Sequence, residues 1–317
     1  MKDAFGRTID YLRLSLTERC NLHCVYCMPS AGGCSSTRAV CTLEELVELA
    51  AACVALGVKK IRLTGGEPLL RGDILALVER LSTLHKDGLE ELCMTTNGKL
   101  LAEYAAPLQA AGLDRLNISL DTLREDRFRS LNQGGVLSRV LDGIAAAEAA
   151  GFARLSLNTV LMKGFNDDEI PELAMLAHGK PWTVRFIELM PIGPAAAMRE
   201  AYLPATRVLE LVPELQLMQD AHAGVARLYT APGWVGAVGL ISPMSCDFCG
   251  QCSRIRITAD GRLKLCLHAA EEIPLRGLHG AALQQAIQAA VQRKPARHQL
   301  AEFQPSQSIR PMNEIGG

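Results

Sequence analysis

Strand-like and helix-like segments alternate along the first 190 residues of the chain. Short runs of aliphatic and β-branched residues predict strands at 9–16, 59–64, 91–95, 115–120, 154–160 and 183–188. Helical patterns lie between them, near 42–57, 73–86, 99–111, 138–150 and 167–178, and Thr42 with Glu45 forms a capping box at the start of the first. This alternation predicts a parallel sheet with right-handed crossovers. Six such units can form an open doubly wound sheet or a barrel.

Three closely spaced cysteines follow the first predicted strand. Their spacing is C-x3-C-x2-C, at Cys20, Cys24 and Cys27. A structural zinc ion takes four protein ligands, and an electron-transfer iron–sulfur cluster takes four thiolates. A group of three therefore predicts a cluster with one iron open to a further ligand. The alternatives are three unrelated buried cysteines and a zinc knuckle with a distant fourth ligand.

A glycine-rich turn, Gly65-Gly66-Glu67-Pro68, follows the second predicted strand. Its glycines allow the backbone to approach a ligand closely, and Glu67 offers a carboxylate. A phosphate-binding loop is the competing interpretation. The chain has no G-x-x-x-x-G-K-[ST] sequence and no G-x-G-x-x-G after the first strand, which argues against that loop.

Beyond residue 194 the alternation ends, and short strands are expected at 225–230, 235–241 and 255–259, with a helix at 282–293. A second group of three cysteines lies here, at Cys249, Cys252 and Cys266. Cys246 or His268 would complete a zinc ribbon, so spacing alone leaves zinc open. Arg254 and Arg256 alternate along a strand, so they share one face and suit the capture of phosphates. A charged face toward solvent is the alternative.

Charge and cysteine content limit the class of protein. The chain has 33 basic and 34 acidic residues, a formal net charge of −1, so we expect neither nucleic acid nor a membrane surface as partner. The longest charge-free apolar run, 49–58, is too short to span a bilayer, and the first residues lack the apolar core of a signal peptide. Eleven cysteines without a secretory context indicate metal chemistry in a reducing compartment, so we expect a cytoplasmic protein with a small-molecule substrate.

Together these motifs resemble the GTP 3′,8-cyclase family of the radical S-adenosylmethionine (SAM) superfamily, over nearly the whole chain. The resemblance is carried by the two cysteine groups and by the segments 62–71, 95–98, 185–190, 249–261 and Gly316-Gly317. It implies an α/β fold, a partial (β/α)6 TIM-type barrel at 1–190, with a C-terminal cluster-binding extension at 191–317. The candidate residues follow or end strands, as expected for a site at the carboxyl edge of a barrel.

The resemblance also implies an activity. GTP would be converted to (8S)-3′,8-cyclo-7,8-dihydroguanosine 5′-triphosphate while SAM is cleaved to methionine and 5′-deoxyadenosine, the first step of molybdenum cofactor biosynthesis. Two 4Fe–4S clusters would be bound, one by Cys20, Cys24 and Cys27, the other by Cys249, Cys252 and Cys266. Residues expected at SAM are Tyr26, Gly66, Glu67, Ser119, Arg185 and Met190. Residues expected at GTP are Arg13, Arg62, Thr95, Ser156, Arg254 and Arg256, the last two also assigned to catalysis.

One position departs from the family pattern. Ser156-Leu157-Asn158 stands where the family commonly has K-x-N, with a lysine toward the GTP phosphates. The resemblance further implies a reductant protein such as flavodoxin or ferredoxin, and a homodimer is compatible with it. A peptide-modifying radical SAM enzyme with an auxiliary cluster and a non-catalytic zinc-ribbon module are the rival interpretations.

Overall fold

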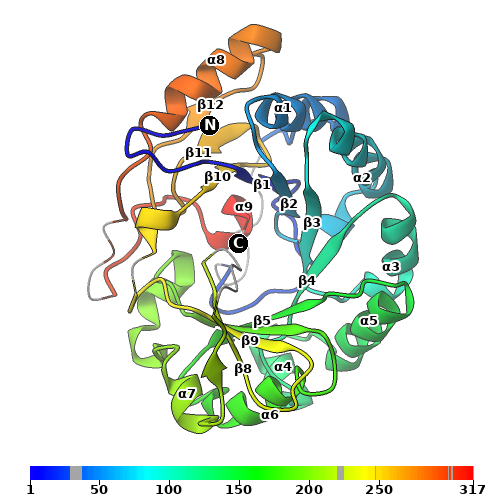
Figure 1. Cartoon of the computed structure of the whole chain (residues 1–317), viewed down its shortest axis with the longest axis vertical. Helices are drawn as coiled ribbons and strands as arrows, with labels where there is room; N and C mark the ends of the chain where they lie inside the picture. The colour runs from blue at the N-terminus through cyan, green and yellow to red at the C-terminus, as the bar shows by residue number, and fades with distance from the viewer. Residues whose placement is uncertain (29–37, 220–224, 247, 299, 301–302, 317) are drawn as a thin grey trace.

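The N-terminal part of the chain forms six parallel β/α units. This computed structural model describes residues 1–28, 38–219, 225–246, 248–298, 300 and 303–316. The six strands are neighbours in chain order: β1 (Tyr11–Ser15), β2 (Lys60–Thr64), β3 (Glu91–Thr96), β4 (Arg115–Ser119), β5 (Ser156–Leu161) and β6 (Thr183–Glu188). The helices of these units form an outer ring around the strands (Figure 1): α1 (Leu43–Ala55), α2 (Ile74–Ser82), α3 (Leu101–Ala110), α4 (Glu125–Leu131), α5 (Leu137–Ala149) and α6 (Ile170–Met175).

The predicted elements of this part are confirmed, with three differences. Helix α2 ends at Ser82 and continues only as a 3-10 turn, and the short helix α4 was not predicted. The helix predicted at 167–178 is a 3-10 turn at Asp167–Glu169 followed by α6, which ends at Met175. The capping box is present, because the Thr42 side chain accepts from the Glu45 backbone N–H at 3.2 Å and Glu45 Oε2 accepts from the Thr42 N–H at 2.8 Å.

The C-terminal part of the chain extends the same sheet at both edges. Strand β9 (Ala237–Ile241) pairs parallel with β6, and β10 (Arg254–Ile257) pairs parallel with β1. Antiparallel strands follow on each outer edge: β8 (Arg227–Thr230) and β7 (Gln216–Leu217) beyond β9, and β11 (Arg262–Lys264) and β12 (Ile273–Pro274) beyond β10. Helices α7 (Arg207–Leu211), α8 (Gly280–Val291) and α9 (Met312–Ile315) complete this part. The sheet remains open, which confirms the partial barrel.

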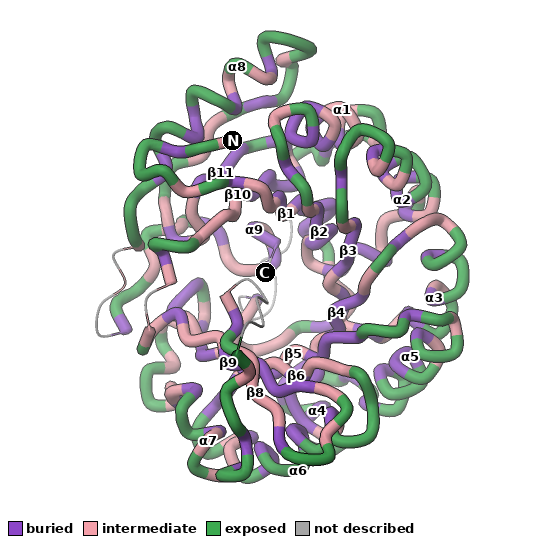
Figure 2. Tube along the Cα trace, in the orientation of Figure 1, coloured by how far each residue is buried: buried purple, intermediate pink, exposed green. Residues whose placement is uncertain are grey.

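The strands direct apolar side chains toward the helices and polar ones toward the barrel interior. In β1, Leu12 and Leu14 are fully buried in the core, whereas Tyr11 and Arg13 line a central cavity. In a complete TIM barrel, branched apolar side chains fill the interior. Here the interior is a cavity of about 920 Å³. Buried residues follow the strands and exposed residues the outer surfaces of the helices (Figure 2).

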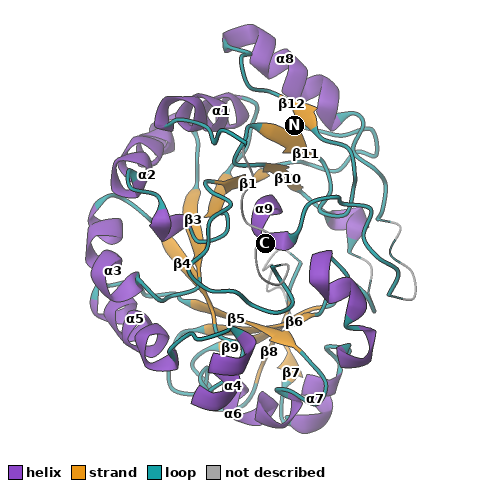
Figure 3. Ribbon diagram, turned by 180° about the vertical axis from the view of Figure 1, so that it is seen from behind, coloured by secondary structure: helices purple, strands orange, loops and turns teal. Residues whose placement is uncertain are grey.

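The view from behind shows the same ring of helices around the strands, with α9 near its centre (Figure 3). No helix within the described ranges combines the length and the apolar character needed to cross a bilayer.

The attachment of β9 to β6 depends on Gly236. A Cβ at this position would lie 2.3 Å from the Trp182 carbonyl oxygen and 2.5 Å from that of Lys180, both backbone atoms. We therefore expect Gly236→Ala to destabilise the fold by about 1–3 kcal/mol through overpacking, measured as a lower midpoint of urea unfolding. Gly72→Ala is the matched control, because a Cβ there meets nothing within 4 Å. Equal midpoints for the two variants would contradict this reading of the β6–β9 edge.

Candidate active site

The first cysteine group lies in the loop that leaves β1 at the carboxyl edge of the barrel. Cys20, Cys24 and Cys27 all line the central cavity, and all are free thiols. Asn97 Nδ2 donates to Cys20 Sγ at 3.6 Å, and Cys24 Sγ donates to Asn132 Oδ1 at 2.7 Å. Burial raises the pKa of Cys20 to about 11 and raises that of Cys24 well above its usual value. These two thiols need a nearby cation to ionise.

The Gly65-Gly66 turn packs directly on this loop. A Cβ on Gly66 would lie 2.3 Å from the Arg19 carbonyl oxygen, and one on Gly65 would lie 2.5 Å from that of Thr17. The Gly66 N–H donates to the Thr17 carbonyl at 2.8 Å. The close approach expected of these glycines is therefore made to the chain segment just before Cys20, while both glycines also line the cavity.

Glu67 is turned into the protein. Its carboxylate is fully buried and accepts from Thr96 Oγ1 at 2.7 Å and from the N–H groups of Asn97 and Leu69 at 2.7 and 3.1 Å. Burial raises its pKa to about 7. The carboxylate thus fastens the glycine turn to the end of β3, and its assignment to SAM stays a prediction.

The other residues expected at SAM line the same cavity: Tyr26, Ser119, Arg185 and Met190. The Tyr26 hydroxyl donates to Asp121 Oδ2 at 2.8 Å, and Asp121 Oδ1 accepts from the Val160 N–H at 2.8 Å. Burial raises the pKa of Asp121 to about 6. This chain of bonds fixes the Tyr26 ring beside the first cysteine group.

The second cysteine group also opens on the cavity, contributed by the C-terminal part of the chain. Cys249 begins a 3-10 turn, Cys252 precedes β10 and Cys266 follows β11. Although burial opposes ionisation of Cys252, the buried Lys294 ammonium lowers its pKa below the usual value. Lys294 Nζ itself donates to the carbonyl oxygens of Arg254 and Leu265, at 2.8 and 2.5 Å.

The two residues considered as a fourth zinc ligand are placed differently. His268 lines the cavity, whereas Cys246 accepts a hydrogen bond from Arg227 Nη2 at 3.0 Å. Within the described ranges, no three His, Cys, Asp or Glu side chains are arranged to hold a single metal ion.

Arginines from neighbouring strands form a row across the barrel interior. The register aligns Arg256 of β10 with Arg13 of β1, Arg13 with Arg62 of β2, Arg62 with Cys93 of β3, and Cys93 with Arg115 of β4. Two further arginines, Arg185 and Arg254, line the same cavity. The sequence predicted five of these six arginines; only their strand register shows that they form a row.

The row is strongly cationic. Burial, together with the neighbouring arginines, lowers the pKa of Arg13 to about 10, that of Arg185 to about 9, and that of Arg256 well below its usual value. A group of buried cations at adjacent positions is stabilised by a bound anion. Arg62 also reaches Thr95 Oγ1 at 3.5 Å, which places that predicted GTP residue at the same row.

Ser156 lies beneath one of these arginines. Its side chain is fully buried, and its hydroxyl accepts from Arg115 Nη2 at 2.8 Å. Arg115 lines the cavity and lies 3.8 Å from Glu91 Oε1. The position where the resemblance leads us to expect a lysine thus supports the guanidinium of the neighbouring strand.

Comparisons with known proteins match this arrangement. Residues 14–177 match the family described as Radical SAM superfamily, and residues 182–300 match Molybdenum Cofactor Synthesis C. The chain is 42% identical to the GTP 3′,8-cyclase of Alkaliphilus oremlandii, over 100% of both chains. It is 46% identical to GTP 3′,8-cyclase of Peptoclostridium acidaminophilum and to GTP 3′,8-cyclase 1 of Pseudomonas aeruginosa, over 99% of this chain and 98% of each relative. The chain belongs to the GTP 3′,8-cyclase family.

A solved structure agrees with the fold of this radical SAM family. SuiB of Streptococcus suis bound to S-adenosylmethionine superimposes with a TM-score of 0.59 at 14% identity, over 89% of this chain and 68% of that chain. This likeness concerns the fold alone.

The residues present fit the family's cofactors, SAM and two 4Fe–4S clusters. Six free thiols in two groups of three face one cavity. Among the described residues, five buried polar atoms at this cavity have no hydrogen-bond partner: Arg115 Nε, Asn117 Oδ1, Asn158 Oδ1, Arg185 Nε and His298 Nε2. Buried polar groups ordinarily have partners, so these atoms are suited to a polar ligand.

Several cavity residues were not identified from the sequence. Lys60, Arg115 and Asn117 face the interior from strands whose other residues were singled out, and Lys294 comes from the end of α8. The period of two along each strand could have indicated the first three, because Lys60 lies two residues before Arg62 and Asn117 two before Ser119. Lys294 carries no such signal.

Tyr11 reports on the charge of the arginine row. Burial by itself would raise the pKa of the Tyr11 phenol, but the cations of Arg62, Arg13 and Arg254 lower this pKa to about 8. We expect one tyrosine of the chain to titrate near that pH, followed by NMR of ¹³Cζ-labelled tyrosine, and Arg62→Gln to raise its pKa. Inorganic triphosphate should raise it too, since a bound anion offsets the cations. Tyr11→Phe assigns the signal, and a phenol unaffected by Arg62→Gln would contradict the electrostatic origin.

Proposed function

We propose that this chain is a GTP 3′,8-cyclase, which converts GTP to (8S)-3′,8-cyclo-7,8-dihydroguanosine 5′-triphosphate in the first step of molybdenum cofactor biosynthesis. The observation that carries the proposal is the shared cavity, in which two groups of three thiols and six arginines face one interior. When bound, the first cluster and SAM would supply the chemistry that removes the ribose C3′ hydrogen of GTP, the hydrogen whose loss a C3′–C8 bond requires.

The protein's own part is to hold the reactants and to exclude water. Cys20, Cys24 and Cys27 would hold the cluster that binds SAM, and the residues assigned to SAM are Tyr26, Gly66, Glu67, Ser119, Arg185 and Met190. Cys249, Cys252 and Cys266 would hold the second cluster, at the guanine. The arginine row then supplies donors for the triphosphate. Because an alkyl radical takes the nearest hydrogen, fixing GTP at both ends decides which hydrogen is removed.

The GTP site would be formed by residues of both parts of the chain. Arg13, Arg62, Thr95 and Ser156 come from the first part, and Arg254 and Arg256 from the extension. Guanidinium groups bind phosphate oxygens through two parallel hydrogen bonds, so Arg254 and Arg256 are suited to orient the triphosphate during the reaction. We propose residue 190 as the boundary between a radical SAM partial barrel at 1–190 and an extension at 191–317 that binds the second cluster and completes the GTP site.

The remaining assignments concern the setting of the reaction. We propose that a flavodoxin-like or ferredoxin-like protein supplies the electron, that the reaction takes place in the cytoplasm, and that the chain works as a monomer or a homodimer. The direct test of the activity is anaerobic incubation of GTP with SAM and dithionite, with the cyclised nucleotide identified by mass spectrometry. Formation of 5′-deoxyadenosine without any cyclised nucleotide would contradict the proposal.

The two cysteine groups should differ in what they support. We expect Cys24→Ala to abolish cleavage of SAM, because the site for SAM is lost. We expect Cys252→Ala to retain SAM cleavage uncoupled from product, because arginines and no glycine turn accompany the second group. Both are measured as 5′-deoxyadenosine and cyclised nucleotide per chain. Unchanged cyclisation in Cys252→Ala, or retained SAM cleavage in Cys24→Ala, would contradict the respective assignment.

Arg115 should supply the cation that the family places at position 156. Arg115→Gln is expected to weaken GTP binding by about tenfold to a hundredfold, the value of one charge-assisted contact. Adding Ser156→Lys to Arg115→Gln should restore GTP affinity, since the new lysine extends from the buried position next to residue 115. Affinity is measured anaerobically by calorimetry. Arg207→Gln is the control, because Arg207 pairs with Glu210 at the surface. Unchanged affinity in Arg115→Gln would contradict the role.

A further inference from the structure

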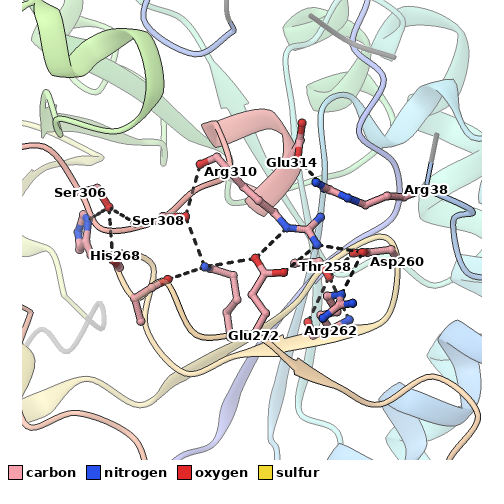
Figure 4. A network of polar contacts seen from close by, with 12 residues as sticks. Arg38, Thr258, Asp260, Arg262, His268, Glu272, Ser306, Ser308, Arg310 and Glu314 are labelled. Atoms are coloured by element: carbon pink, nitrogen blue, oxygen red, sulfur yellow. Dashed lines mark hydrogen bonds and ion pairs between the residues drawn. The ribbon is translucent and has the colours of Figure 1, made fainter. Parts of the chain in front are cut away.

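Arg310 binds three carboxylates in the interior of the protein. Its side chain is 3% exposed. Nε and Nη2 donate to the two oxygens of Glu272 at 2.7 and 2.8 Å, and Nη2 also donates to Asp260 Oδ2 at 2.9 Å (Figure 4). Nη1 donates to Glu18 Oε1 at 3.1 Å. All three carboxylates are nearly buried. One guanidinium therefore pairs with all three of these carboxylates.

The three carboxylates come from segments that bear directly on the cavity. Glu18 lies two residues before Cys20, in the loop of the first cysteine group. Asp260 follows β10, the strand that carries Arg254 and Arg256. Glu272 lies directly before β12, at the edge of the same sheet. The guanidinium therefore joins the first cysteine loop to the substrate strand of the C-terminal extension.

The chain after Arg310 enters the barrel. Met312 and Asn313, in α9, line the cavity, and α9 lies inside the ring of strands (Figure 1). Asn313 Nδ2 donates to the Glu18 carbonyl oxygen at 3.1 Å. Arg256 Nη1 donates to the Gly316 carbonyl oxygen at 2.8 Å, so the tail contacts an arginine of the row. Gly316 therefore lies at the arginine row, and Gly317 lies outside the described residues.

Gly316 has little freedom to move once it is placed. Its φ is +81°, and a Cβ there would lie 2.3 Å from Thr64 Oγ1, at the end of β2. The pair of contacts at Arg310 and at Gly316 therefore fixes α9 at both of its ends. Two outer contacts add to this. Arg38 Nη1 donates to Glu314 Oε2 at 2.9 Å (Figure 4), and it lies 3.6 Å from Glu18 Oε1.

We propose that Arg310 is a positioning residue, which fixes the C-terminal tail between the first cysteine loop and β10 and so orients Arg256 toward the substrate. The inference rests on the proposed function for its catalytic consequence, and on the structure alone for the position of the tail. Arg310 itself is not among the residues that line the central cavity. Its loss leaves Glu18, Asp260 and Glu272 close together, with Lys264 as the nearest remaining buried cation, 3.5 Å from Glu272.

The test is the variant Arg310→Gln in the full-length protein loaded with both clusters. We expect unchanged iron content, retained cleavage of SAM, and a loss of about tenfold or more in cyclised nucleotide per SAM cleaved, because a displacement of about 1 Å in a positioned group has effects of that size. Hydrogen–deuterium exchange should rise in the peptide that contains 312–316. For Arg310→Lys, we expect cyclised nucleotide per SAM cleaved to lie between the values of the parent protein and of Arg310→Gln, since one ammonium cannot reach three carboxylates.

Removal of Gly316 and Gly317 separates positioning from general stability. The double variant combines this deletion with Arg310→Gln. If Arg310 acts through the tail, the double variant should make as much cyclised nucleotide per SAM cleaved as the deletion variant alone. Arg262→Gln is the matched control: Arg262 lies 3.5 Å from the same Asp260, but its side chain is 44% exposed, so coupling and exchange should not change.

The outcomes distinguish this inference from its alternatives. The inference would be overturned if the losses of Arg310→Gln and of the tail deletion added up in the double variant. It would also be overturned if Arg310→Gln made less cyclised nucleotide per SAM cleaved without increased exchange in the tail. Loss of iron with exchange increased throughout the barrel would show Arg310 to be a general stabiliser and would also overturn it. If the parent protein makes no cyclised nucleotide, the proposed function fails, and the exchange data still decide whether Arg310 fixes the tail.

Discussion

The burial of several guanidinium groups inside one barrel is the constraint on which the rest of this structure depends. Neighbouring strands lie about 4.8 Å apart, and in-register positions on β10, β1, β2 and β4 carry arginines. Like charges at such spacing repel, and burial removes the water that would screen them. The burial-lowered pKa of Arg13, Arg185 and Arg256 expresses this cost. A site of this kind is complete only with an anion, and a triphosphate supplies the most charge in the smallest space.

The polar interior also explains why the C-terminal part of the chain joins the barrel. An open sheet of six strands would leave the edges of β1 and β6 unpaired. Strands β10 and β9 pair with these edges, and β10 at the same time brings Arg256 into register with Arg13 and Arg254 into register with Tyr11. The second cysteine group is carried on the turns around β10 and β11, so its thiols face the same cavity as the first group. Pairing at one edge thus places Arg254, Arg256 and the second cysteine group at the cavity.

The tail and the glycine turn illustrate how close backbone approaches hold the site together. The chain just before Cys20 packs closely on Gly66, and the end of β2 packs closely on Gly316. A Cβ would lie 2.3 Å from the Arg19 carbonyl oxygen in the first case and 2.3 Å from Thr64 Oγ1 in the second. Buried carboxylates fix the same segments, because Glu67 accepts a hydrogen bond from Thr96 at the end of β3 and Glu18 pairs with Arg310. Buried ion pairs contribute less to net stability than to a defined geometry when all partners are present. A radical reaction requires this definition, because selectivity depends on position.

The sequence alone determined the class of fold and the chemistry of the ligands. A period of two in the strands and of 3.6 in the helices reflects local burial, so the six β/α units could be predicted nearly to their ends, and cysteine spacing within a loop of eight residues is local too. The tertiary structure decided the rest. Strand order places Arg256 beside Arg13, although the two lie far apart in the chain. It also places Arg115 over Ser156, turns Glu67 inward, and brings Arg310 to three separate carboxylates. Such pairings depend on which edges meet and which side chains share a buried space, and no local pattern of residues encodes them.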